Sequence, residues 1–135
     1  MNVIVDTSVW SLALRRAKRV DTGPTRELAQ LIEDGRVAML GPVRQELLSG
    51  IKDKGQFGML REHLRAFPDL SLETADYEDA ASAFNQCRER GVQGSNTDFL
   101  ICAAATRRDY AIFTTDGDFR HFSRVLKVRL HEPRS

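Results

Sequence analysis

The sequence predicts an α/β fold, a single-domain parallel sheet flanked by helices in an α/β/α sandwich. Short aliphatic segments alternate with longer segments whose apolar residues recur at helical spacing, which is typical of parallel strands linked by helices. A chain of 135 residues fits one domain, and 41% hydrophobic residues are enough for one core. No internal repeat, low-complexity tract or linker divides the chain, so we expect residues 1–135 to form one domain.

The first half of the chain predicts strands that are each followed by helices. Residues 3–5 are a short aliphatic run with the character of a buried strand. Leu28, Leu31 and Ile32 make the apolar face of a helix that Gly35 ends. We expect strands at 3–5 and 37–40, and helices at 8–19, 25–35, 42–51 and 56–67.

The second half predicts more helix, with strands near the C-terminus. A long amphipathic helix is expected to turn Ala80, Ala81, Phe84 and Cys87 inward. A later helix is apolar nearly all round, which indicates burial. We expect helices at 74–91, 96–108 and 117–123, a stub strand at 70–72, and strands at 111–115 and 125–130.

Composition excludes several classes of protein. The net charge of +1 does not indicate a class of binding partner, so any recognition surface must come from local segregation of charge. Cys87 and Cys102 are too few for a disulfide framework and indicate a reducing compartment. The longest apolar run, residues 99–105, is far shorter than the roughly 20 residues of a membrane span. We therefore expect a soluble, cytoplasmic protein.

Acidic residues stand at comparable places in four segments. Asp6 follows the first strand directly, and Asp116 follows a later one. Glu46 lies near the start of the helix after the second strand, and Asp98 begins the apolar helix. Ligands of open parallel sheets gather at the carboxyl ends of the strands. We therefore expect the four carboxylates to point into one cleft.

Each acid taken alone also has a structural explanation. Asp6 could cap the helix that follows it, and the spacing of Ser95 and Asp98 matches a capping box. Glu46 could be a solvated helix residue, and Asp116 begins a turn with the following glycine. Their joint placement favours a functional cluster over four separate structural roles.

Four like charges share a small cleft only when they are protonated or neutralised by a cation. The sequence places no lysine or histidine beside Asp98, whose helical neighbours one turn on are apolar. Without a cluster of histidine or cysteine, oxygen ligands favour Mg²⁺ or Mn²⁺ over Zn²⁺. We therefore expect a hard divalent cation at this cleft.

Four segments, NVIVDTSVW, GPVRQELLSGI, NTDFLICAAA and IFTTDGDF, occur in this order over essentially the whole chain. They resemble the four acidic motifs of PIN-domain ribonucleases, and most of all those of VapC toxins. The resemblance implies a PIN-like fold, Mg²⁺- or Mn²⁺-dependent hydrolysis of RNA, and inhibition by a cognate antitoxin. Apolar helices at 28–35 and 57–67 could form a homodimer interface or an antitoxin groove, although they could equally pack the core.

The resemblance also assigns roles by position. The four catalytic acids it implies are Asp6, Glu46, Asp98 and Asp116. Of these, Asp6, Asp98 and Asp116 are expected to hold one or two ions, with Glu46 acting directly or through a bound water. Thr114 matches a supporting hydroxyl residue. Asp118 fits the ending of the fourth motif, which leaves open whether it or Asp116 lies nearer the metal. Hydrolysis is expected to leave a 5′-phosphate and a 3′-hydroxyl.

RNA that approaches an acidic cleft needs cations beside it. The densest basic group follows Asp6 in the sequence and is our expected RNA contact: Arg15, Arg16, Lys18 and Arg19. A solvated helix face is the alternative for this group. Trp10 and Phe119 could stack on a base, although core packing is the simpler role for both.

Other functions compete with an RNA-cleaving toxin. A non-catalytic module could bind RNA or protein on the same fold, but a phosphate binder would avoid four carboxylates at its site. A phosphoacceptor receiver domain would need an acidic pair after its first strand, where Asp6 is single. A DNA nuclease or a housekeeping RNA-processing nuclease of the PIN type is closer and stays open.

Overall fold

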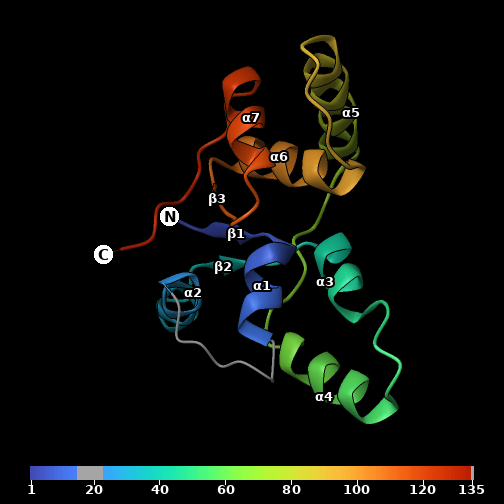
Figure 1. The fold of residues 1–135 in the computed structure, drawn as a ribbon, viewed down its shortest axis with the longest axis vertical. Coiled ribbons are helices and arrows are strands. Elements are labelled where there is room, and N and C mark those ends of the chain that lie inside the picture. Colours follow the sequence, from blue (N-terminus) through green and yellow to red (C-terminus); the bar gives the residue numbers. More distant parts are fainter. Residues whose placement is uncertain (15–22, 135) are drawn as a thin grey trace.

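The structure is a computed structural model that describes residues 1–14 and 23–134. Each strand is followed along the chain by one or more helices, as the sequence predicts (Figure 1). The strands are β1 (Val3–Val5), β2 (Val37–Ala38) and β3 (Ala111–Phe113), and the helices are α1 (Thr7–Leu14), α2 (Gly23–Glu33), α3 (Gly41–Leu48), α4 (Lys54–Leu64), α5 (Thr74–Glu89), α6 (Asn96–Arg108) and α7 (Asp118–Val125).

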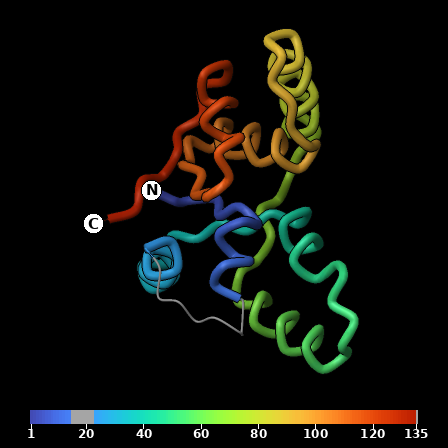
Figure 2. Tube along the Cα trace, viewed as in Figure 1, coloured from blue at the N-terminus to red at the C-terminus, as the bar shows by residue number. Residues whose placement is uncertain are grey.

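The strands form a parallel sheet in the order β2, β1, β3. β1 is central, and its residues Val3, Ile4 and Val5 are completely buried because helices cover both faces of the sheet. Helices α1 to α4 lie on one side, whereas α5, α6 and α7 lie on the other (Figures 1 and 2). The strand order therefore changes direction at β1, which has β2 on one side and β3 on the other. The parallel pairing of these strands confirms the predicted parallel α/β architecture.

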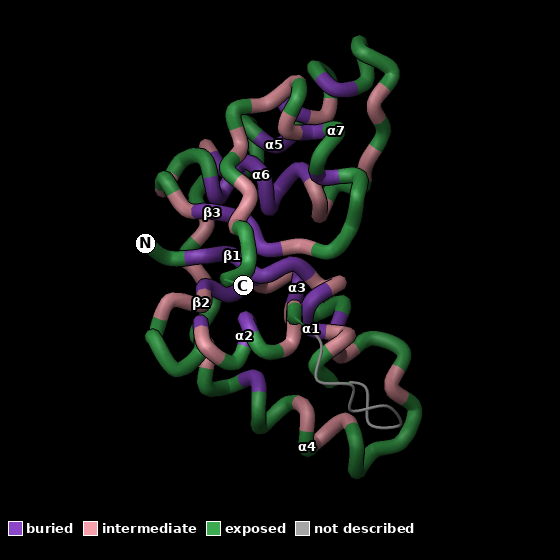
Figure 3. Tube along the Cα trace, turned by 60° about the vertical axis from the view of Figure 1, so that its left-hand side comes forward, coloured by how far each residue is buried: buried purple, intermediate pink, exposed green. Residues whose placement is uncertain are grey.

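Burial concentrates where the sheet meets α6 (Figure 3). Every residue of α6 from Phe99 to Ala105 is buried, as its nearly uniform apolar character predicts. α5 packs against α6 through a stripe spaced at four, three and four residues: Asp76, Ala80, Ala83 and Cys87. The predicted inward face of this helix was therefore wrong at Ala81, which is exposed, and Ala83 takes its place.

Three further expectations differ from the structure. The predicted strand at 125–130 does not form, because Val125 ends α7 and Leu130 alone pairs, in parallel, with Ile112. Ile32, expected in the core, is 40% exposed. The stub at 70–72 is reduced to one bridge between Met39 and Asp69.

Other sequence expectations hold in the described residues. Trp10 and Phe119 are buried, which confirms core packing as their role, and Trp10 packs edge-on against Phe67 with ring centroids 5.2 Å apart. Cys87 and Cys102 are buried free thiols. Of the helices in residues 1–14 and 23–134, none combines the length and apolar character needed to cross a membrane.

A buried ion pair ties the start of α5 to the end of α6. The completely buried carboxylate of Asp76 accepts two hydrogen bonds from Arg108, at 2.8 and 3.0 Å, and Arg107 lies 2.8 Å away. Asp76 also accepts the backbone N–H of Glu73, which completes a capping box. The hydrogen bond from Arg108 and these neighbours hold the pKa of Asp76 well below its ordinary value, against the opposing effect of burial.

We expect Asp76→Ala to lower the free energy of unfolding by about 3–5 kcal/mol, because it leaves Arg108 without its buried partner. Denaturant unfolding measures this loss. The matched control is Asp79→Ala, which removes an exposed carboxylate of the same helix 3.8 Å from Arg107 and should cost less than about 1 kcal/mol. Equal losses in the two variants would contradict a structural role for the buried pair.

The same pair makes stability depend on pH. Because the folded pKa of Asp76 is lowered, its contribution is fully present above the unfolded pKa of about 3.9 and is lost as pH falls toward the folded value. The stability difference between the wild type and Asp76→Asn should therefore shrink below about pH 4. A difference that stays constant down to pH 2 would show that this carboxylate does not titrate in that window.

Candidate active site

Asp6 is a buried carboxylate at the carboxyl end of the central strand, with only 6% of its surface exposed. Its backbone N–H donates to the carbonyl of Phe113, so β1 and β3 end at the same level. Its Oδ2 accepts hydrogen bonds at 2.8 Å from the hydroxyls of both Ser8 and Thr114. These two bonds fix the carboxylate at the edge of the sheet.

Thr114 links Asp6 to the acidic turn after β3. Its Oγ1 also accepts the backbone N–H of Asp116 at 3.0 Å. Oδ1 of Asp116 in turn accepts the backbone N–H of Asp118 at 2.9 Å. Thr114 therefore contacts two of the acids, and Asp118 contacts Asp116.

Glu46 reaches the same edge from α3. Thr7, the residue after Asp6, donates its hydroxyl to Glu46 Oε2 at 3.1 Å. Although Glu46 is exposed, this bond holds it beside the start of α1. The structure therefore connects the second acid to the first through a side chain adjacent in sequence to Asp6.

Asp98 has the capping role that the sequence predicts and a second, electrostatic property. It exchanges hydrogen bonds with Ser95: the Asp98 backbone N–H donates to Ser95 Oγ, and Asp98 Oδ2 accepts the Ser95 N–H, both at 3.1 Å. Burial raises the pKa of Asp98, the Ser95 bonds oppose the rise, and the charges of Asp6 and Asp116 add to it. Three of the four predicted acids are thus close enough to interact electrostatically.

A glycine keeps the two acid-bearing elements together. Gly94 precedes α6, and Phe122 of α7 packs on its backbone so closely that an added Cβ would lie 2.5 Å from the ring. Phe99 would be 3.1 Å from the same Cβ. Because α6 carries Asp98 and the turn before α7 carries Asp116, this close approach sets their relative position.

The four acids share one pattern of hydrogen bonding. In each, one carboxylate oxygen is engaged by a neighbouring hydroxyl or backbone N–H, and the other accepts no hydrogen bond from a described residue; these acids are Asp6, Glu46, Asp98 and Asp116. Within residues 1–14 and 23–134, no arginine, lysine or histidine forms an ion pair with any of them. The site therefore holds negative charge and free oxygen ligands.

This donor set fits a hard divalent cation, since it offers oxygen atoms without histidine or cysteine. In the described part of the chain, however, no three His, Cys, Asp or Glu side chains form a group able to hold a metal ion as they stand. The carboxylates are neighbours along one edge and not a formed ligand group. Repulsion between like charges opposes their closer approach.

Two hydroxyl residues of this network were not among the site residues predicted from the sequence. Thr7 and Ser8 follow Asp6 directly, and each bonds to an acid: Thr7 to Glu46, and Ser8 to Asp6. Ser8 Oγ also accepts the backbone N–H of Thr115 at 3.0 Å. The signal available in the sequence was a pair of hydroxyl residues immediately after an acid at a strand end.

The predicted RNA-contacting group lies outside the described residues, since Arg15, Arg16, Lys18 and Arg19 all fall between 15 and 22. Two described basic residues at the end of α6, Arg107 and Arg108, are engaged by Asp76 as described above. The expected RNA contacts therefore remain predictions.

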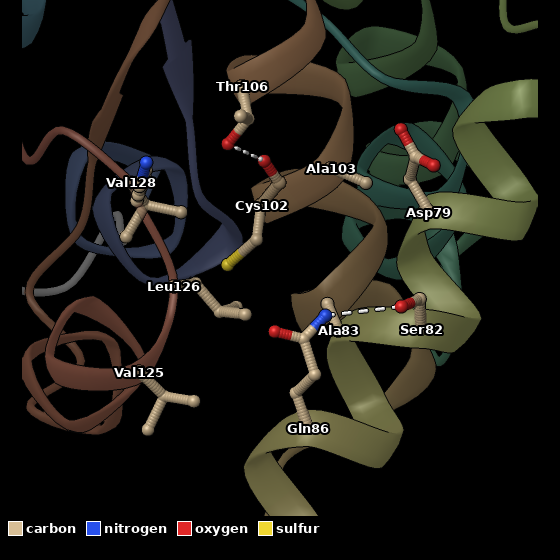
Figure 4. A pocket seen from close by; sticks show the side chains of 11 residues that line it. Asp79, Ser82, Ala83, Gln86, Cys102, Ala103, Thr106, Val125, Leu126 and Val128 are labelled. Carbon is tan, nitrogen blue, oxygen red and sulfur yellow. Dashed lines mark hydrogen bonds between the residues drawn. The ribbon is translucent and has the colours of Figure 1, made fainter.

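A cavity of about 330 Å³ lies away from the acids, between α5, α6 and the segment after α7 (Figure 4). Cys102 directs its thiol toward this space, and Gln86 and Ser82 hydrogen-bond to each other at 3.1 Å. None of the four acids lines this cavity. Its size alone therefore does not make it the site of chemistry.

The sequence of this chain is similar to those of a known protein family. Residues 3–125 match the PIN domain family. Over 129 residues the chain is 30% identical to Ribonuclease VapC11 of Mycobacterium tuberculosis and to VapC ribonuclease Mb1587 of Mycobacterium bovis, covering 94% of this chain and 96% of each relative.

Solved structures show the same fold at lower identity. VapBC2 from Rickettsia felis, bound to a DNA fragment from its promoter, matches with a TM-score of 0.78 and 19% identity over 97% of this chain and 98% of that one. FitAcB from Neisseria gonorrhoeae matches with a TM-score of 0.76 and 20% identity over 97% of both chains.

Three observations lead to one conclusion. They are the parallel sheet with acids at its carboxyl edge, the family match over 3–125 and the nearly full-length similarity to two VapC ribonucleases. The chain belongs to the PIN-domain family, and within it to the VapC ribonucleases.

Proposed function

We propose that this protein is a Mg²⁺- or Mn²⁺-dependent endoribonuclease toxin of a toxin–antitoxin system, acting as one PIN-like domain over residues 1–135. The observation that carries the proposal is the row of acids at the carboxyl edge of β1 and β3, each with a free oxygen and without a cationic partner among the described residues. The proposed catalytic acids are Asp6, Glu46, Asp98 and Asp116.

Asp6, Asp98 and Asp116 would hold the metal through their free oxygens. When bound, a divalent ion lowers the pKa of a coordinated water and offsets charge that develops on the phosphate. Ser8 and Thr114 hold the Asp6 carboxylate in one orientation, which reduces the reorganisation needed for binding. Hydrolysis of the phosphodiester leaves a 5′-phosphate and a 3′-hydroxyl.

Asp116 is the better candidate for the fourth acid than Asp118. Thr114 joins Asp116 to Asp6, and the charge of Asp116 raises the pKa of Asp98. Asp118 contacts Asp116 through its backbone N–H, which orients the turn. We therefore assign Asp118 a supporting role.

Asp6→Asn and Asp98→Asn should each lower the rate of RNA cleavage by at least about 100-fold, because the amide keeps the local hydrogen bonds but loses the charge that a metal requires. Cleavage of a labelled RNA, together with circular dichroism, measures rate and folding. Asp79→Asn, on the far α5 helix, is the charge-matched control and should cleave as the wild type does. Full activity in either site variant would exclude this site.

Magnesium binding has a readout that is independent of cleavage. A ligand at 100 times its dissociation constant stabilises the folded state by about 2.7 kcal/mol, so saturating MgCl₂ should raise the melting temperature of the wild type. The rise should be much smaller for Asp98→Asn at the same ionic strength. Equal shifts in the two proteins would place the ion elsewhere.

The proposed partner is a cognate antitoxin, and the free chain is proposed to form a homodimer in the cytoplasm. Similar folds occur in complexes such as VapBC2 and a toxin–antitoxin complex from Klebsiella pneumoniae, with TM-scores of 0.78 and 0.62. Leu14, Ile32 and Met59 are exposed apolar side chains on α1, α2 and α4, which all lie on one side of the sheet (Figure 1). Such side chains suit a protein interface.

Induced expression of the chain should arrest bacterial growth, and co-expression of the small protein encoded by the adjacent gene should relieve the arrest. The Asp98→Asn variant should permit growth and should still copurify with that protein. Light scattering of the free variant should give twice the mass of one chain. Normal growth with active RNA cleavage would instead indicate a housekeeping nuclease.

A further inference from the structure

A second cavity, of about 160 Å³, adjoins the acidic edge. One wall is the turn after β3, and the other is the C-terminal segment that follows the Ile112 and Leu130 bridge. We call it the Arg120 cleft and define it by its lining residues: Pro24, Ile112–Gly117, Arg120 and Leu130–Pro133. Because Thr114 and Asp116 belong both to this lining and to the acidic network, the cleft opens beside the proposed reaction centre.

The C-terminal wall of the cleft is held in place. Glu27, a buried carboxylate of α2, bonds to His131 Nε2 at 2.5 Å and pairs with Arg134 at 3.2 Å. The backbone N–H of His131 donates to the carbonyl of Ile112 at 2.7 Å, and the His131 ring packs edge-on against Phe113. This wall is therefore tied both to α2 and to the sheet.

Arg120 provides the cleft with positive charge that no described side chain neutralises. Its guanidinium forms no hydrogen bond or ion pair within residues 1–14 and 23–134, in contrast to Arg44, Arg108 and Arg129, which are all paired with aspartates. The other basic side chain of the lining, His131, is engaged by Glu27. An anion that enters the cleft would therefore meet Arg120.

The volume of the cleft limits what it can hold. About 160 Å³ is well below the roughly 300 Å³ at which small-molecule pockets begin, so it suits one group of an extended polymer. Asp116 and Glu132 also line it, so an anionic group would be stable only next to the guanidinium. Arginine binds phosphate oxygens through two parallel N–H donors, which matches this requirement.

We propose that the Arg120 cleft is a subsite for a backbone phosphate of the RNA strand, one that neighbours the cleaved bond, and that Arg120 is the residue that binds it. The inference rests on the proposed function, because it needs RNA to cross the acidic edge. It adds a substrate contact on α7, separate from the basic group at 15–19. Arg120 thereby offsets the repulsion between the acids and the strand they cleave.

The test compares Arg120→Ala with Arg124→Ala, which removes an exposed arginine one turn further along α7 and outside the cleft. Binding of a single-stranded RNA oligonucleotide of mixed sequence is measured at several KCl concentrations and constant MgCl₂, in the full chain carrying Asp98→Asn to prevent cleavage. Arg120→Ala should weaken binding about tenfold and reduce the slope of log affinity against log salt by about 0.7, the value for one phosphate contact on a single strand. Arg124→Ala should stay within about twofold with an unchanged slope.

Cleavage by the otherwise wild-type chain gives the second readout. Arg120→Ala should raise KM and leave kcat largely unchanged, because it removes binding and not chemistry. Equal salt slopes in the two arginine variants, with wild-type cleavage intact, would overturn this inference and leave the proposed function standing. Absence of cleavage in the wild type would overturn the proposed function, and absence of RNA binding would overturn both.

Discussion

Repulsion between carboxylates at one edge of a small sheet is the constraint on which the rest of this structure depends. β1 is buried on both faces and ends directly in Asp6, so a negative charge stands at the margin of the core. Two hydroxyls, from Ser8 and Thr114, satisfy one oxygen of that carboxylate without neutralising it. The other oxygen of Asp6 accepts no hydrogen bond from a described residue, which is the basis of the proposed cation site.

Acids that lie in or beside the core have two opposite environments in this fold. Asp76 and Glu27 are paired with arginine or histidine, and their pKa values lie below the ordinary range because these partners outweigh burial. Asp98 has no such partner among the described residues, and burial raises its pKa. The paired acids stabilise contacts between segments, whereas Asp98 forms no ion pair with a described residue. This contrast separates the ion-paired carboxylates from the proposed catalytic acid Asp98 more clearly than burial alone.

The elements around the acids also explain how a negatively charged polymer could approach a negatively charged edge. The C-terminal segment is bound to α2 through Glu27 and to the sheet through Ile112, and it forms a wall next to Asp116. α7 packs against the loop before α6 at Gly94 and brings Arg120, which has no ion-pair partner in residues 1–14 and 23–134, to that wall. A metal bound by the acids and a phosphate bound by Arg120 would thus both reduce the repulsion between the acids and the RNA.

The sequence by itself determined the parallel α/β architecture, the four acids at the ends of their segments and the capping box at Ser95, because hydrophobic periodicity and capping depend on residues near one another in the chain. Only the tertiary structure decided which side chains meet. It joined Asp116 rather than Asp118 to Asp6 through Thr114 and brought Thr7 to Glu46. It also placed Arg120 beside Leu130–Pro133, the segment that begins where the predicted strand at 125–130 would end. Those outcomes depend on packing between segments far apart in sequence, since alternating apolar residues at 125–130 suit either a strand or a segment laid against helices.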